Sequence, residues 1–120
     1  MKKISSYQDL KVWQKGHFFL KDLIIISKKI PYSLESGIIK KQLIRSGSSV
    51  VANIVEGFAG HRGKSYKNYL IISRRSATET DYWLFLLRDL KLLRAKDYRS
   101  LVSQLKEVIA MLTAIINKLP

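Results

Sequence analysis

Residues 45–57 read RSGSSVVANIVEG, and this stretch decides the fold. Its valines and isoleucine follow a helical spacing, and a second stripe of polar residues runs beside them at helical intervals. The stripe consists of Ser46, Ser49, Asn53 and Glu56. A packed helix normally carries Leu or Ile on such a face, and a buried polar group without a hydrogen bond costs about 1–3 kcal/mol. The stripe therefore needs partners, which either another segment of the chain or a ligand must supply.

The composition is that of one folded, strongly basic domain over residues 1–120. Hydrophobic residues make up 47% of the chain, and 22 Lys and Arg against 9 Asp and Glu give a formal net charge of +13. There is no cysteine, which excludes disulfides and thiolate metal sites, and the 2 histidines are too few for a His-rich metal cluster. We expect no secretory signal, because no apolar run follows the basic first residues before Asp9 and Lys11, and the most apolar segments are shorter than a membrane span. We expect a cytoplasmic protein with no membrane partner, no metal and no cofactor.

The remaining chain reads as four helices with short connections. Proline occurs only at positions 31 and 120, and glycines cluster at 57, 60 and 63, which leaves long helical patterns between them. The predicted helices cover residues 6–30, 34–58 and 66–93, and a fourth has Asp97 in its first turn and ends near residue 119. Strand patterns are absent, so the predicted fold is all-α, an antiparallel up-down-up-down four-helix bundle. The candidate N-terminal caps are Ser6, then Ser33 or Ser36, and Ser65.

An antiparallel pairing of the second and third predicted helices supplies the polar stripe with partners. A connection centred near residue 60 or 61 sets the register to within about one turn. Arg45 then lies close enough to Glu79 to form an ion pair. The predicted facing pairs are Ser49 with Ser73, Ser46 with Ser76, and Asn53 with Tyr69. The resulting structural seam comprises Arg45, Ser46, Ser49, Asn53, Glu56, Ser73, Ser76 and Glu79.

Two helices carry more apolar surface than a monomeric bundle can bury. Residues 82–87, YWLFLL, are apolar all round the third helix, and residues 18–26, FFLKDLIII, are nearly so in the first. Each helix of a bundle buries one stripe, so the surplus predicts a homo-oligomer. The predicted interface residues are Phe18, Phe19, Trp83 and Phe85.

Basic residues are the candidate functional groups. The ending Gly63-Lys64-Ser65 matches only the last part of a P-loop, and the segment follows a helix rather than a strand, so nucleotide hydrolysis is not indicated. Free amides at the start of the third helix do favour an anion there. We expect nucleic-acid phosphates as the partner and no reading of bases, since exposed aromatic stacking platforms are not evident. The predicted nucleic-acid-binding residues are Arg62, Lys64, Lys67, Arg74, Arg75 and Arg88, of which Lys67, Arg74 and Arg88 share one helical stripe.

Several short elements occur together in a fixed order: residues 7–13 (YQDLKVW), Arg45-Ser46, Ser49, residues 53–57 (NIVEG), then Ser76 and Glu79. In these elements the chain resembles, over nearly its whole length, the four-helix bundle proteins encoded in intervening sequences of bacterial 23S rRNA genes. These proteins, also called S23-like, are related to the accessory protein of diversity-generating retroelements. The resemblance implies a ring-like homopentamer, a role in binding RNA or DNA with structured RNA favoured, and no enzymatic activity. The alternative is a protein-interaction scaffold or accessory subunit, for example for a reverse transcriptase.

Overall fold

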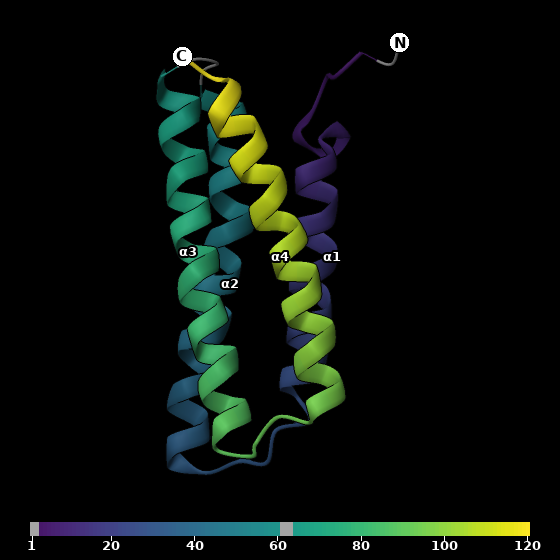
Figure 1. Cartoon of the computed structure of the whole chain (residues 1–120), viewed down its shortest axis with the longest axis vertical. Helices are drawn as coiled ribbons and strands as arrows, with labels where there is room; N and C mark the ends of the chain where they lie inside the picture. Colours follow the sequence, from purple (N-terminus) through teal and green to yellow (C-terminus); the bar gives the residue numbers. More distant parts are fainter. Residues whose placement is uncertain (1–2, 61–63) are drawn as a thin grey trace.

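Four long helices form an antiparallel bundle in the computed structural model, which describes residues 3–60 and 64–120 (Figure 1). The helices are α1 (Lys11–Ser27), α2 (Leu34–Gly60), α3 (Lys64–Asp89) and α4 (Ala95–Lys118). No strand occurs in these two ranges, and the predicted all-α four-helix fold is confirmed. α1 contacts α2 and α4, and α3 contacts the same two helices, so α1 and α3 lie diagonally across the bundle.

Each helix contributes one apolar stripe to a single core. The stripe is most regular in α4, where Leu101, Leu105, Val108 and Leu112, spaced by four and three residues, are all buried. Complete burial of such a side chain is worth about 1.5–3 kcal/mol. By length and composition alone α4 would also suit a membrane span, as the core helix of a bundle often does. Here its apolar stripe packs against the other helices.

The first helix is shorter than predicted at both ends. The carboxylate of Asp9 accepts hydrogen bonds from the amides of Ser5 and Ser6, and this capping contact belongs to a separate 3-10 turn, Tyr7–Asp9. Leu10 then adopts an extended conformation, with φ −77° and ψ 126°, before α1 begins. At the other end, Pro31 disfavours helical geometry in the residue before it, so the helix stops at Ser27 rather than at residue 30.

The start of α2 is fixed by two serines in reciprocal contact. Ser36 N donates to Ser33 Oγ at 3.0 Å, and Ser33 N donates to Ser36 Oγ at 2.8 Å. The Ser36 hydroxyl also donates to Pro31 O at 2.8 Å. Ser33 is therefore the cap, as one of the two predicted alternatives, and the completely buried Ser36 anchors the preceding connection to the helix.

The pairing of α2 with α3 is displaced by about one turn from the predicted register. Hydrogen bonds join Ser49 to Ser76 and Ser46 to Thr80. Each partner lies three or four residues further along α3 than the one predicted from the sequence. The antiparallel arrangement was predicted correctly, and only the point of reversal was misplaced.

Gly57 lies where α2 and α3 approach each other closely. It is inside α2, which continues to Gly60, two residues beyond the predicted end at residue 58. A Cβ atom at position 57 would stand 2.9 Å from Tyr69 Cβ and 3.2 Å from the Tyr66 ring. Glycine is therefore required at position 57 for close packing of the two helices. α3 begins at Lys64, so the predicted cap Ser65 is already inside its first turn.

Lys91 ends α3 in a left-handed conformation, with φ 60°. Lys91 N donates to Arg88 O, and Leu92 N donates to Leu87 O, both at 2.9 Å, which is the pairing of a Schellman motif. Glycine is the usual residue at this position because a Cβ atom is strained there. The helix therefore ends at Asp89, ahead of the predicted end near residue 93.

Replacing Lys91 with glycine should raise the free energy of unfolding by about 0.5–1 kcal/mol, because it removes this strain. Urea denaturation measures the change as a higher midpoint at an unchanged slope. Lys91→Ala is the matched control, since it removes the same charge but keeps the Cβ atom. Equal stabilisation by alanine and glycine would assign the effect to charge and contradict the strain.

Candidate nucleic-acid interface

The polar seam between α2 and α3 is satisfied from within the protein. Ser73 Oγ donates to Val50 O at 2.6 Å, and Thr80 Oγ1 donates to Ser46 Oγ at 2.9 Å. These three hydroxyl-bearing side chains are completely buried. The hydroxyls of Ser49 and Ser76 pair at 2.8 Å nearer the surface. Because the buried groups already have partners, a ligand is not needed to explain the polar stripe.

The predicted ion pair between Arg45 and Glu79 is present at the edge of this seam. Arg45 Nε also donates to Gln42 Oε1 at 2.9 Å, and Trp83 Nε1 donates to Glu79 Oε2 at 2.9 Å. Both charged groups are well exposed, so the pair contributes at most about 1 kcal/mol. Glu79 Oε2 therefore contacts both the Arg45 guanidinium and the Trp83 indole.

Two predicted seam residues contribute differently. Asn53 Nδ2 donates to Ser49 O at 2.8 Å and to Ser49 Oγ at 3.0 Å, so it closes the seam within α2 rather than across to α3. Glu56 is exposed, and its assignment to the buried seam was wrong. At that level Ile54 and Gly57 face the interior, which turns position 56 toward solvent.

The heptad-spaced cations of α3 lean toward α4. Lys67 and Arg74 are half-buried, whereas Arg88 is exposed. Long basic side chains can cover apolar surface with their stems while their charged ends stay near water. Their charges remain available to an anion along the edge between α3 and α4. The contacts are Lys67 Nζ to Leu119 O at 3.5 Å, Arg74 Nη1 to Thr113 Oγ1 at 3.3 Å, and the Arg88 guanidinium 5.1 Å from the centre of the Tyr98 ring.

The other predicted nucleic-acid-binding residues lie at or near the same helix. Arg75 is exposed beside Arg74 on α3. Arg62 and the side chain of Lys64 lie outside the part of the chain that the structure describes. The described residues contain two ion pairs, Lys15–Glu107 and Arg45–Glu79. Most of the described cations therefore have no carboxylate within ion-pair distance.

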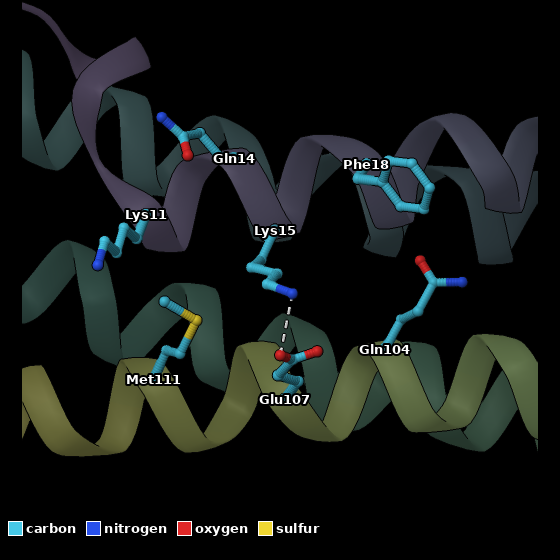
Figure 2. Close-up of a pocket in the computed structure, with 7 residues that line it drawn as sticks. All are labelled: Lys11, Gln14, Lys15, Phe18, Gln104, Glu107 and Met111. Carbon is cyan, nitrogen blue, oxygen red and sulfur yellow. Dashed lines mark ion pairs between the residues drawn. The ribbon is translucent and has the colours of Figure 1, made fainter.

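A groove of about 590 Å³ runs between α1 and α4 (Figure 2). Lys15 Nζ and Glu107 Oε1 meet across it at 3.0 Å, and Phe18 lies at one end. Gln104 Nε2 donates to Asp22 Oδ2 at 2.8 Å, whereas its buried Oε1 accepts no hydrogen bond from the described residues. The ion pair neutralises the middle of the groove, so this hollow does not suit a phosphate. The lining residues are Lys11, Gln14, Lys15, Phe18, Gln104, Glu107 and Met111.

The four predicted interface residues divide between surface and core. Phe18 is 65% exposed on α1, and Phe85 is 46% exposed on α3. Phe19 is completely buried in the core of its own chain, so its assignment to an oligomer interface was wrong. The 3.6-residue period turns position 19 inward when position 18 faces outward. Trp83 is half-buried and held by Glu79.

One exposed aromatic residue was missed. Tyr32, in the connection from α1 to α2, is 85% exposed. The sequence predicts no exposed stacking platform, and Tyr32 lies outside the helical patterns that place the other aromatic residues. The available signal was the position of Tyr32 directly after Pro31, in a short connection that follows Lys28 and Lys29. Elsewhere, no three His, Cys, Asp or Glu side chains of the described residues gather as metal ligands would.

These features define a class of protein: a basic, antiparallel four-helix bundle with an internally satisfied polar seam and many surface cations, few of which form ion pairs among the described residues. Residues 8–114 match the family of 23S rRNA-intervening sequence proteins, and the chain belongs to that family. No curated protein matches the chain.

A solved structure supports the same assignment. It is the crystal structure, at 1.70 Å resolution, of a protein of unknown function from the S23 ribosomal protein family of Bacteroides thetaiotaomicron VPI-5482. The two chains are 30% identical, and the match covers 88% of this chain and 97% of the other with a TM-score of 0.81. The resemblance to this family noted in the sequence is therefore confirmed.

Proposed function

We propose that this protein is a nonenzymatic, homo-oligomeric bundle that binds nucleic acid, with structured RNA favoured, through contacts to phosphates. The observation that carries the proposal is the excess of unpaired cations: a net charge of +13 on a chain whose described residues form two ion pairs. A folded domain with this excess creates a positive potential that attracts polyanions from a distance. Phosphate contacts supply most of the affinity of such proteins for nucleic acid.

The edge between α3 and α4 is the best-supported place for these contacts. Lys67, Arg74 and Arg88 follow it at heptad spacing, interrupted by Asp81 between the two arginines, and Arg75 lies beside them. Their stems are supported by α4, which reduces the side-chain entropy lost when a phosphate binds. Arg62 and Lys64 precede or begin the same helix in the sequence. A row of cations along one edge suits the regular backbone of a folded RNA.

The affinity for a structured RNA should fall steeply with salt. If the six predicted cations each neutralise one phosphate, the log–log slope approaches about −5, and affinity drops about a thousandfold between roughly 50 and 200 mM salt. Fluorescence anisotropy with a labelled RNA hairpin measures this slope. Binding that is insensitive to salt, or absent at low salt, would overturn the proposal.

Replacing Arg62, Lys64, Lys67 and Arg74 together with glutamine should weaken binding to all RNA sequences alike and flatten the slope by up to about four. The matched control replaces four exposed lysines of other surfaces, Lys3, Lys11, Lys21 and Lys41, which removes the same charge. A control variant that loses as much affinity as the α3 variant would contradict a site on α3 and indicate a diffuse field.

The proposed oligomer is supported by apolar side chains on opposite sides of the bundle. Phe18 and Ile25 are exposed one heptad apart on α1, and Tyr82 and Phe85 are exposed on α3. A contact between the α1 face of one copy and the α3 face of the next is heterologous, because it joins two different faces. These faces lie on opposite sides of the bundle, since α1 and α3 are diagonal. A heterologous contact that closes gives a ring, in line with the homopentamer that the family resemblance implies.

A further inference from the structure

The two connections at one end of the bundle lie side by side. The connection from α1 to α2 and the connection from α3 to α4 both run along the lower end in Figure 1. A small cavity of about 130 Å³ joins them, with Lys29 on one side and Arg94 and Asp97 on the other. Residues more than sixty positions apart in the sequence therefore form one continuous surface.

This end carries more positive than negative charge. Five exposed cations lie on or next to the two connections, and none of them forms an ion pair with a described residue. The carboxylates that belong to the same segments are Glu35, Asp89 and Asp97. The surface therefore suits a flexible anion that can follow the cations and avoid the carboxylates. The cations are Lys28, Lys29, Lys91, Arg94 and Lys96.

Tyr32 stands at this end on a rigid support. The Ser36 hydroxyl accepts from Ser33 N and donates to Pro31 O, both at 2.8 Å, so one buried side chain fixes the backbone on both sides of the tyrosine. Tyr32 Cε1 lies 3.5 Å from the Cβ position of Gly37, which places the ring against the first turn of α2. The ring is nonetheless 85% exposed. An exposed aromatic ring on a backbone that hydrogen bonds hold in place is available to stack on a base.

The strained Lys91 lies at the same end. Its left-handed φ of 60° is a conformation that favours glycine, yet the chain has a lysine there. Backbone strain of this kind is concentrated at functional sites. Lys91 is exposed at the same end of the bundle as Tyr32, so its charge is accessible to a phosphate there.

We propose that this end of the bundle, formed by residues 28–33 and 90–96, binds unpaired nucleotides of single-stranded nucleic acid. A base stacks on the Tyr32 ring, and the flanking phosphates contact the cations around it. This inference rests on the proposed nucleic-acid function, but it assigns a second surface, distinct from the α3 edge and specific for single strands. Duplex RNA keeps its bases stacked on one another, so it cannot use Tyr32.

The test compares a labelled oligouridylate with an RNA duplex of the same length. Tyr32→Ala should weaken binding of the single strand by about 5- to 150-fold, the loss expected for one stacked base, and leave duplex binding unchanged. Tyr32→Phe retains the ring and should bind the single strand like the wild type. The exposure of Tyr32 predicts an unchanged melting temperature for both variants, which separates a binding defect from unfolding.

The outcomes distinguish failure of the stacking site from failure of the proposed function. The stacking site is overturned if Tyr32→Ala binds the single strand as well as the wild type does, or if it loses equal affinity for single strand and duplex. In either case, salt-dependent binding of the duplex still supports the proposed function. Absence of salt-dependent binding to either RNA overturns both the stacking site and the proposed function.

Exposed Leu34, Ile38 and Leu90 also lie near this end. Binding to phosphatidylserine vesicles that depends on Tyr32, without single-strand binding, overturns the inference in favour of a membrane surface.

Discussion

Replacing Gly57 with alanine should destabilise the protein by about 1–3 kcal/mol, although alanine ordinarily favours a helix over glycine. The added Cβ would meet Tyr69 Cβ at 2.9 Å. That atom is attached directly to the α3 backbone and cannot swing aside, so α2 and α3 must separate locally. Chemical denaturation measures the loss as a lower urea midpoint.

Gly60→Ala provides the matched control for this prediction. Gly60 is the last residue of the same helix, and a Cβ atom there would meet nothing within 4 Å. Its replacement should be neutral or stabilising by up to about 1 kcal/mol. If the two alanine variants had the same stability, the close approach of the helices at Gly57 would be contradicted.

A charge placed on either proposed apolar face should dissociate the oligomer into monomers. Phe18→Glu disables the α1 face, and Phe85→Glu disables the α3 face, because burying an unpaired carboxylate costs several kcal/mol. Ala52→Glu is the control, since residue 52 is exposed on α2 and lies on neither face. Light scattering with size-exclusion chromatography measures the mass of each variant.

Mixing the two monomeric variants distinguishes the possible symmetries. In a head-to-tail ring, each variant keeps one intact face, and the two intact faces are complementary, so an equimolar mixture should form a one-to-one heterodimer. A contact between two α1 faces would instead leave Phe85→Glu able to dimerise by itself. A wild-type protein that is monomeric at physiological salt would contradict the proposed assembly altogether.

The ion pair of Arg45 with Glu79 shows how far the sequence could determine the fold. Helix periodicity, the proline at 31 and the short connections were enough to place α2 against α3. The side chains of Arg45 and Glu79 are long enough to meet even when the predicted register is wrong by one turn. The hydroxyl pairs did not tolerate it, because serine and threonine reach only their nearest neighbours. Their partners depend on the exact register of the two helices, which the sequence determines only to within about one turn.

The candidate site was less predictable for a different reason. Heptad spacing places Lys67, Arg74 and Arg88 on one face of α3, but spacing alone does not say that α4 lies beside that face. Tyr32 has no periodic partner, so its exposure depends on how the Ser33–Ser36 cap directs the connection. Local hydrogen bonds of this kind are decided by tertiary geometry rather than by composition.

The polar seam between α2 and α3, with its paired hydroxyls, affects how the chain folds during synthesis. Its two helices are consecutive in the sequence, and their contact is the most extensive in the bundle. A hairpin of this kind can form as soon as residue 89 has left the ribosome, before α4 has emerged, because each buried hydroxyl already finds its partner within it. α4 then completes the bundle last, and in doing so it covers the open side of α1 and supports the cationic edge of α3.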